Sequence, residues 1–155
     1  MPDIVSPQVR SRMMAGIGGK NTKPELQVRK ALHSLGFRYS LHAKDLPGKP
    51  DLKLPKYNAV IFVNGCFWHG HDCHLFRLPG TRTEFWRAKI EGNRMRDART
   101  RTALNNHGWR VLDIWECAIK GKTSLEVADW IRKIAEWLKG DNSRLEIRGN
   151  DYGGC

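Results

Sequence analysis

Apolar and polar residues follow two different periods along this chain, and the periods predict where helices and strands lie. A helical spacing of apolar residues follows the capping box Thr22–Glu25 and ends at Gly36. Alternating or continuous apolar runs, which are typical of strands, occur around 37–41, 51–54, 59–63 and 109–115. Further helices are predicted over about 6–15, 83–106 and 123–139. The pattern therefore indicates helices and strands in the order α-β-β-β-α-β-α after the first short helix.

This order predicts an α/β fold with a mixed four-stranded sheet flanked by helices. The strand at 59–63 is wholly apolar, so we expect it near the centre of the sheet. A chain of 155 residues is expected to form one main domain, here 21–140, preceded by an arm over 1–20. The segment 141–155 is polar and rich in glycine, and we expect it to be a flexible tail.

The balance of charged residues indicates which class of molecule the chain binds. Lys and Arg number 27 against 16 Asp and Glu, which gives a formal net charge of +11 and a pI near 9.9. Such an excess favours binding to the phosphates of a nucleic acid. No apolar run approaches the roughly 20 residues that span a bilayer, and the N-terminus has no secretory signal pattern. We therefore expect a cytoplasmic, nucleoid-associated protein whose cysteines are reduced.

A cluster of cysteine and histidine predicts a metal site after the third strand. Cys66, His71 and Cys73 lie within eight residues, and Cys117 follows the fourth strand. Zinc binds four sulfur or nitrogen ligands tetrahedrally, so one structural Zn²⁺ is expected to tie the loop to the core. Spacing alone does not say whether His69, His71 or His74 supplies the nitrogen, and buried thiols without metal are the alternative.

Three carboxylates and one imidazole are candidates for chemistry. Asp51 opens a strand after Pro50, where it can hold Mg²⁺, although an Asp in such a turn is common. Asp97 shares a helical stripe with apolar residues that should meet the sheet, although a surface ion pair is the alternative. Glu25 is explained largely by its capping box. His69 titrates near neutral pH unless zinc takes it, which suits proton transfer.

Three aromatic residues are candidates for contact with bases. Phe67 and Trp68 adjoin a predicted zinc ligand, and Trp86 opens the long helix. Such rings can enter a base stack and part it. The alternative is that one or more of them belongs to the core.

Over about residues 8–140 the chain resembles the very-short-patch repair (Vsr) endonucleases. The resemblance is carried by motifs in a fixed order: Lys23-Pro-Glu25, Pro-Gly-Lys-Pro-Asp51, Val-Asn-Gly-Cys66-Phe-Trp-His69-Gly-His71-Asp-Cys73, Thr81-Arg-Thr-Glu-Phe-Trp86, Lys89-Ile-Glu-Gly-Asn93, Arg96-Asp97 and Gly108-Trp-Arg-Val-Leu with Trp115-Glu-Cys117. The resemblance implies a restriction-endonuclease-like core. It also implies a Mg²⁺-dependent endonuclease that nicks duplex DNA 5′ to the T of a T·G mismatch, the product of 5-methylcytosine deamination.

The resemblance also implies roles for single residues. Asp51 and the main-chain carbonyl of Val63 would bind Mg²⁺, with two ions expected, and His69 would be the general acid or base. Glu25 and Asp97 would order metal-bound waters. The implied zinc ligands are Cys66, His71, Cys73 and Cys117. The implied DNA contacts are Phe67, Trp68 and Trp86 from the major groove, Met14 from the minor groove, and Lys89 and Asn93 at the mismatched pair.

The chain departs from the family pattern at Asn64, where some members carry a histidine, and it lacks the acid-x-Lys of restriction enzymes. Asn64 is able to hold a metal-bound water but is not expected to be essential. We expect a monomer, because an asymmetric lesion offers no two-fold axis. Mismatch-repair proteins and a repair polymerase are the partners expected downstream. The alternatives are a non-catalytic zinc DNA-binding module, or a related nuclease that acts on junctions or methylated sites.

Overall fold

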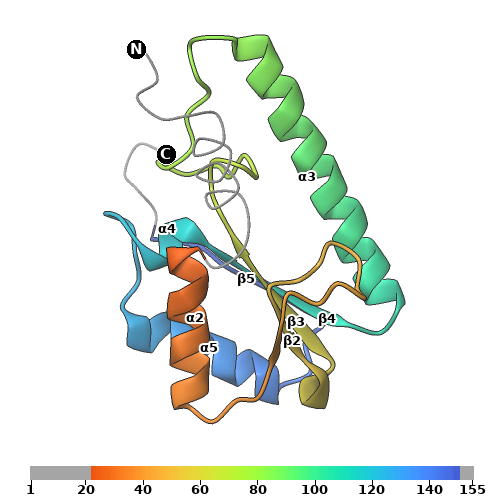
Figure 1. Ribbon diagram of the computed structural model, residues 1–155. Helices are drawn as coiled ribbons and strands as arrows, with labels where there is room; N and C mark the ends of the chain where they lie inside the picture. The colour runs from red at the N-terminus through yellow and green to blue at the C-terminus, as the bar shows by residue number, and fades with distance from the viewer. Residues whose placement is uncertain (1–21, 151–155) are drawn as a thin grey trace, which may run out of the picture.

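The computed structural model describes residues 22–150 (Figure 1). Its elements, in chain order, are α2 (Lys23–Ser34), β1 (Ser40–Leu41), β2 (Leu52–Leu54), the 3₁₀ turn η1 (Pro55–Tyr57), β3 (Ala59–Asn64), α3 (Thr83–Asn106), β4 (Arg110–Trp115), α4 (Glu116–Ile119), α5 (Val127–Lys139) and β5 (Arg144–Ile147). The helix predicted over 6–15 and the DNA contact predicted at Met14 lie outside the described residues.

The strands form one mixed sheet in the order β1-β2-β3-β4-β5. The pairs β1–β2 and β2–β3 are antiparallel, whereas β3–β4 and β4–β5 are parallel. An α/β fold with a mixed sheet is therefore confirmed, and so is the central position of β3. The predicted number of four strands is wrong, because the described sheet has five.

The fifth strand lies in the segment expected to be a flexible tail. Residues Arg144–Ile147 pair in parallel with β4, with Leu112 opposite Leu145 and Ile114 opposite Ile147. Leu145 and Ile147 alternate with Arg144 and Glu146, so a strand signal was present, but it spans only four residues. Pairing with β4 supplies the backbone hydrogen bonds that such a short segment cannot make alone.

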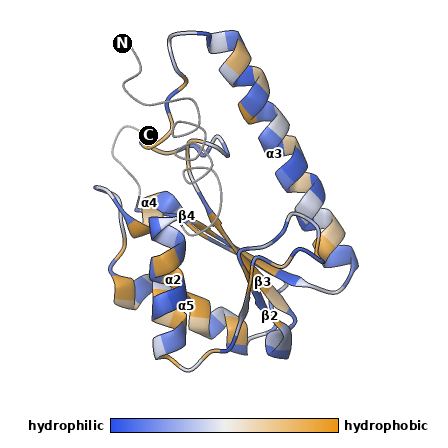
Figure 2. Ribbon diagram, viewed as in Figure 1, coloured by the Kyte–Doolittle hydropathy of each residue, from blue (hydrophilic) through white to orange (hydrophobic). Residues whose placement is uncertain are grey.

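The helices lie on both faces of the sheet because the strands bury side chains on both. On one face, α2 and α5 pack over a core that includes Leu32, Ile61, Leu112 and Trp130. On the other face, Leu104 of α3 joins a smaller cluster of Val60, Phe62 and Val111. Figure 2 shows the apolar colour concentrated in the central strands and α5, whereas α3 is largely polar.

Helix α3 agrees with its predicted bounds, whereas α5 is shorter than predicted and begins at Val127, after the short helix α4. Figure 1 shows α3 running well beyond the sheet on its N-terminal side, next to the long loop that follows β3. That loop approaches α3 closely at Gly70, whose φ is +59° and where a Cβ would lie 2.5 Å from the Ile90 side chain. The fold therefore places the loop, the end of β3 and the first half of α3 together. Within residues 22–150, no helix is both long and apolar enough to cross a membrane.

Candidate active site and metal centre

A cleft of about 850 Å³ opens where β3 ends. Its walls come from the segment before β2, the loop after β3 and the middle of α3. Four of the residues predicted to bind Mg²⁺ or to act in catalysis line this one cleft: Asp51, Val63, His69 and Asp97. The structure thus brings together side chains that are up to 46 positions apart in the chain.

Asp51 is held against β3 by its own carboxylate. Its Oδ2 accepts a hydrogen bond of 2.7 Å from the backbone N–H of Val63. The N–H and C=O of a strand residue face the same neighbour. The Val63 carbonyl is therefore directed to the side on which Asp51 lies, and the two oxygens suit a hard cation such as Mg²⁺.

Glu25 lies next to Asp51, with one carboxylate oxygen of each within 4.8 Å of the other. The Thr22 hydroxyl accepts from the Glu25 N–H at 3.4 Å, so this half of the predicted cap is present, and the Glu25 side chain itself is buried. Burial and the neighbouring Glu25 carboxyl raise the pKa of Asp51 from 3.8 to about 8. Two carboxyl groups this close repel each other when both are ionised. A bound cation would reduce that repulsion.

His42 is a site residue that the sequence reasoning missed. Its Nε2 lies 3.2 Å from both carboxylate oxygens of Glu25, and it lines the same cleft as Asp51. The signal was the strand register: Leu41 pairs with Leu52, and the His42 N–H then donates to the Asp51 carbonyl at 3.0 Å. A hairpin between the predicted strands at 37–41 and 51–54 would have placed positions 42 and 51 side by side.

His69 is paired with Asp97 rather than with the cysteines. Its Nδ1 lies 2.5 Å from Asp97 Oδ2, and each side chain is 28% exposed. An ionised carboxylate only accepts hydrogen bonds, so Nδ1–H donates and Nε2 is the nitrogen left to exchange a proton. Asp97 contacts His69 directly. The role of Glu25 and Asp97 in ordering metal-bound waters stays a prediction.

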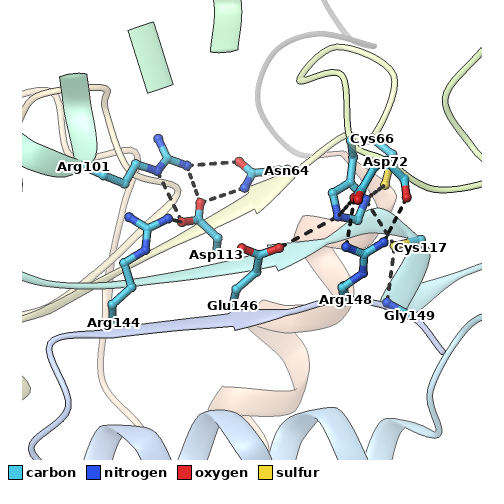
Figure 3. A network of polar contacts seen from close by, with 11 residues as sticks. Asn64, Cys66, Asp72, Arg101, Asp113, Cys117, Arg144, Glu146, Arg148 and Gly149 are labelled. Carbon is cyan, nitrogen blue, oxygen red and sulfur yellow. Dashed lines mark hydrogen bonds and ion pairs between the residues drawn. The ribbon is translucent and has the colours of Figure 1, made fainter. Parts of the chain in front are cut away.

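A buried network of ion pairs and hydrogen bonds surrounds Asp113 (Figure 3) and reaches Asp97 through Arg101. Arg101 lies 3.8 Å from Asp97 and makes a shorter ion pair with Asp113 on β4. Asp113 also accepts from Arg144 of β5 at 3.1 Å and from the side-chain amide of Asn64 at 2.7 Å. Asn64 thus donates its amide to Asp113, and the sequence reasoning had singled out neither Asp113 nor Arg101.

Replacing Asp113 by Ala is expected to lower the free energy of unfolding by about 3 kcal/mol, because it leaves the buried Arg101 without its closest counter-charge. Urea unfolding of the two proteins measures the difference. Asp129→Ala is the matched control, since Asp129 makes an exposed ion pair with Arg132 at 3.7 Å and should change stability by less than about 1 kcal/mol. Equal losses in the two variants would contradict the assigned importance of the network.

The predicted zinc ligands converge. The ligand atoms of Cys66, His71, Cys73 and Cys117 all lie within 4.8 Å of one another. The Nδ1 atom of His71 is 3.6 Å from the sulfur of Cys66 and 3.6 Å from that of Cys117. Among the described residues, His69 and His74 are not part of this group, so His71 is the histidine that lies with the cysteines. Three sulfurs and one imidazole fit a closed tetrahedral zinc site.

The cysteines lie close enough to shift one another's pKa. The pKa of Cys66 is raised, first by its hydrogen bond with Cys117 and then by burial, whereas the pKa of Cys117 falls to about 4. Burial also raises the pKa of Cys73. A bound divalent cation would deprotonate all three thiols.

The residues of β5 and those directly after it contact the cysteine cluster and the loop after β3 (Figure 3). Arg148 donates to the side chain and to the carbonyl of Asp72 at 2.9 Å, and the Gly149 N–H donates to Cys117 Sγ at 3.3 Å. Glu146 lies 3.9 Å from His71 Nε2. The segment expected to be a tail therefore reaches both the buried ion pairs and the cysteine cluster.

The predicted DNA-contacting rings form one partly exposed group. Phe67, Trp68 and Trp86 lie with ring centroids 5.2 to 5.9 Å apart. Phe67 and Trp68 line the cleft, and Asn93 donates to the Trp68 carbonyl at 2.8 Å. Lys89 is exposed on α3 near these rings. The rings are therefore outside the main core, which leaves their edges open to a ligand in the cleft.

Known proteins resemble this chain over most of its length. The family model described as DNA mismatch endonuclease Vsr matches residues 2–75. The type II nicking enzyme V.XorIIP of Xanthomonas oryzae pv. oryzae is 48% identical over 126 residues, or 81% of this chain and 93% of that protein. The DNA mismatch endonuclease Vsr of Escherichia coli is 39% identical over 147 residues, or 95% and 94%. The type II nicking enzyme V.NmeAIP of Neisseria meningitidis is 45% identical over 122 residues, or 79% and 87%.

Proposed function

This chain belongs to the Vsr family of DNA mismatch endonucleases, and from that premise we propose that it nicks duplex DNA 5′ to the T of a T·G mismatch. DNA-nicking hydrolysis is what the family shares, and T·G selectivity is the proposed refinement. One observation carries the proposal: Asp51, His69 and Asp97 line the same cleft as Phe67 and Trp68. Groups suited to phosphodiester chemistry therefore lie beside rings suited to parting a base stack.

In this mechanism Asp51 and the Val63 carbonyl would hold Mg²⁺ at the end of β3, within a restriction-endonuclease-like sheet. Bound Mg²⁺ would supply a Lewis acid that stabilises charge on the scissile phosphate. Asp97 fixes the imidazole of His69 through Nδ1, at 2.5 Å. His69 Nε2 then exchanges a proton with the attacking water or the leaving oxygen. Glu25 contributes negative charge beside Asp51.

The proposed role of the cysteine cluster is structural. A zinc ion bound by Cys66, His71, Cys73 and Cys117 would hold the ends of β3 and β4 together, because two of these ligands follow the two strands directly. The same loop carries Phe67, Trp68 and His69 between its ligands. Zinc would thus orient the rings and the imidazole without taking part in the reaction.

The direct test incubates the protein with Mg²⁺ and three duplex substrates: one with a T·G mismatch, one fully paired and one four-way junction. We expect a single nick 5′ to the mismatched T and little cleavage of the paired duplex. Cleavage of the junction alone would favour the related nuclease, and binding without cleavage would favour the DNA-binding module. Sequencing the nicked 5′ ends from a T·G library with randomised flanks then defines the preferred context, which matters because several relatives are named type II nicking enzymes.

Trp68→Ala is expected to reduce the preference for T·G over paired duplex by about tenfold. Base–aromatic stacking contributes about 1–3 kcal/mol, and parting a stack costs least at a weakened pair. Competition between the two duplexes measures the ratio. Phe85→Ala is the control, because Phe85 is an exposed ring on the same helix as Trp86 and does not line the cleft. An unchanged ratio in Trp68→Ala would remove this ring from mismatch selection.

A further inference from the structure

Three side chains from separate segments bring their ligand atoms together beside the end of β3. Glu25 comes from the first turn of α2, His42 from the segment after β1, and Asp51 from the residue before β2. One nitrogen and two carboxylate oxygens, one from each residue, all lie within 4.8 Å of one another. The cluster combines a histidine with two acidic residues, so its donors are not oxygen alone.

The spacing of these atoms suits a shared cation. His42 Nε2 is 3.2 Å from the Glu25 oxygens. In an octahedral site with ligand bonds of about 2.1 Å, neighbouring ligand atoms are separated by about 3 Å. Glu25 and Asp51 place two carboxyl groups in this small cluster, and the Glu25 side chain is buried, so their negative charge is costly without a counter-charge. A cation would offset that charge from inside the cluster.

The position of His42 is fixed by a backbone hydrogen bond. The His42 N–H donates to the Asp51 carbonyl at 3.0 Å, which continues the antiparallel pairing of β1 with β2. Its φ of +48° turns the chain at this residue, and the imidazole lines the cleft with Asp51. The ring therefore has a defined direction relative to the carboxylate.

We propose that His42 is a third protein ligand of the cation held by Asp51, and that it shifts the preference of this site from Mg²⁺ towards Mn²⁺. Sites built from carboxylate and carbonyl oxygens suit Mg²⁺, whereas an imidazole nitrogen is a softer ligand that favours transition metals. The inference rests on the proposed function, because the cation concerned is the one that would act in nicking.

Arg29 contacts both Glu25 and His42, which offers a competing explanation for the position of the His42 ring. Its guanidinium is 2.7 Å from Glu25 Oε2 and 3.2 Å from His42 Nε2. Arginine has only N–H donors, so Nε2 must present its lone pair to Arg29 or its proton to Glu25. In the proposed site the cation takes that lone pair in place of Arg29, which keeps its bond to Glu25. In the competing explanation, His42 and Arg29 only hold the Glu25 carboxylate.

The test measures Mn²⁺ and Mg²⁺ affinity by calorimetry on the full zinc-loaded chain without DNA. His42→Gln replaces the imidazole nitrogen by an amide oxygen of similar reach, and His107→Gln is the control at an exposed histidine at the end of α3. We expect the ratio of Mn²⁺ to Mg²⁺ affinity to fall by about tenfold in His42→Gln and to stay unchanged in His107→Gln. A ratio does not depend on the fraction of protein that is folded.

Each outcome decides one question. An equal ratio in the wild type and His42→Gln, or no Mn²⁺ bound by the wild type, would overturn the proposed ligand. Asp51→Asn should remove this binding in both metals, and binding that survives it would place the cation elsewhere and also overturn the proposal. Tight Mn²⁺ binding through His42 in a protein that fails to nick T·G duplex would contradict the proposed function while leaving the ligand assignment intact.

Discussion

Asp51→Asn is expected to abolish nicking while raising the thermal stability of the protein at alkaline pH in the absence of added Mg²⁺. Asn can still accept the Val63 N–H bond of 2.7 Å, but it cannot ionise. Loss of the carboxylate removes several kcal/mol of transition-state stabilisation, and every 4 kcal/mol is about a thousandfold in rate. Single-turnover nicking of a T·G duplex measures the first effect, and nicking at the wild-type rate would show that the site is misassigned.

The stability gain follows from the direction of the Asp51 pKa. Burial and Glu25 raise this pKa from 3.8 to about 8 in the folded protein, so folding favours the neutral carboxyl. The stability that Asp51 contributes is fully present below about pH 4 and is lost as the pH rises through about 8. At pH 9 the wild type therefore folds around a buried charge that the variant lacks. At pH 6 the stability gain of the variant is smaller, because part of the wild-type loss occurs only between pH 6 and about 8.

Thermal unfolding at pH 6 and pH 9 without added Mg²⁺ measures this difference, with about 2–4 °C expected for each kcal/mol gained. Asp45→Asn is the matched control, because Asp45 is exposed and its pKa is lowered by its bond to Lys53. That variant should show no gain at pH 9. A difference between Asp51→Asn and the wild type that is the same at both pH values would contradict the proposed burial of charge.

Cys117→Ser is expected to lose the zinc ion and to lower the unfolding midpoint by about 10 °C or more. Structural zinc contributes on the order of 10 kcal/mol in small domains, which is comparable with the whole stability of a domain. Here Cys117 also receives the Gly149 N–H, so its loss releases both the loop after β3 and the segment after β5. Zinc content by mass spectrometry and thermal unfolding measure the two effects.

The remaining cysteine, Cys155, offers a control in the same chain. Cys155→Ser should keep one zinc per protein and an unchanged midpoint. Retention of a full zinc equivalent by Cys117→Ser would show that Cys117 is not a ligand. Loss of zinc from Cys155→Ser would show that the ligand set is incomplete. Either result would change the proposed role of the cluster.

The amino-acid sequence by itself determined the elements whose signal is local and long. The 24-residue helix α3 has its predicted bounds, because a helical pattern continues over many turns until Gly108 follows it. The wholly apolar run at 59–63 marked the central strand, and the cysteine spacing marked the metal cluster. Motifs in a fixed order identified the family, which carried Asp51, His69 and Asp97 with it. These features depend on residues that are close together in the sequence. They can therefore be predicted without knowing which distant segments contact each other.

Only the tertiary structure decided which distant residues became neighbours. In the folded chain Arg144–Ile147 form a fifth strand, and Asp113 is buried between Arg101 and Arg144. The tertiary structure also directed His71 to the thiols, paired His69 with Asp97, and set His42 beside Glu25 and Asp51. The physical reason is that periodicity records which face of its own element a residue occupies. Contacts between elements depend on strand register and on where helices cross the sheet, and those are set by packing of the whole chain.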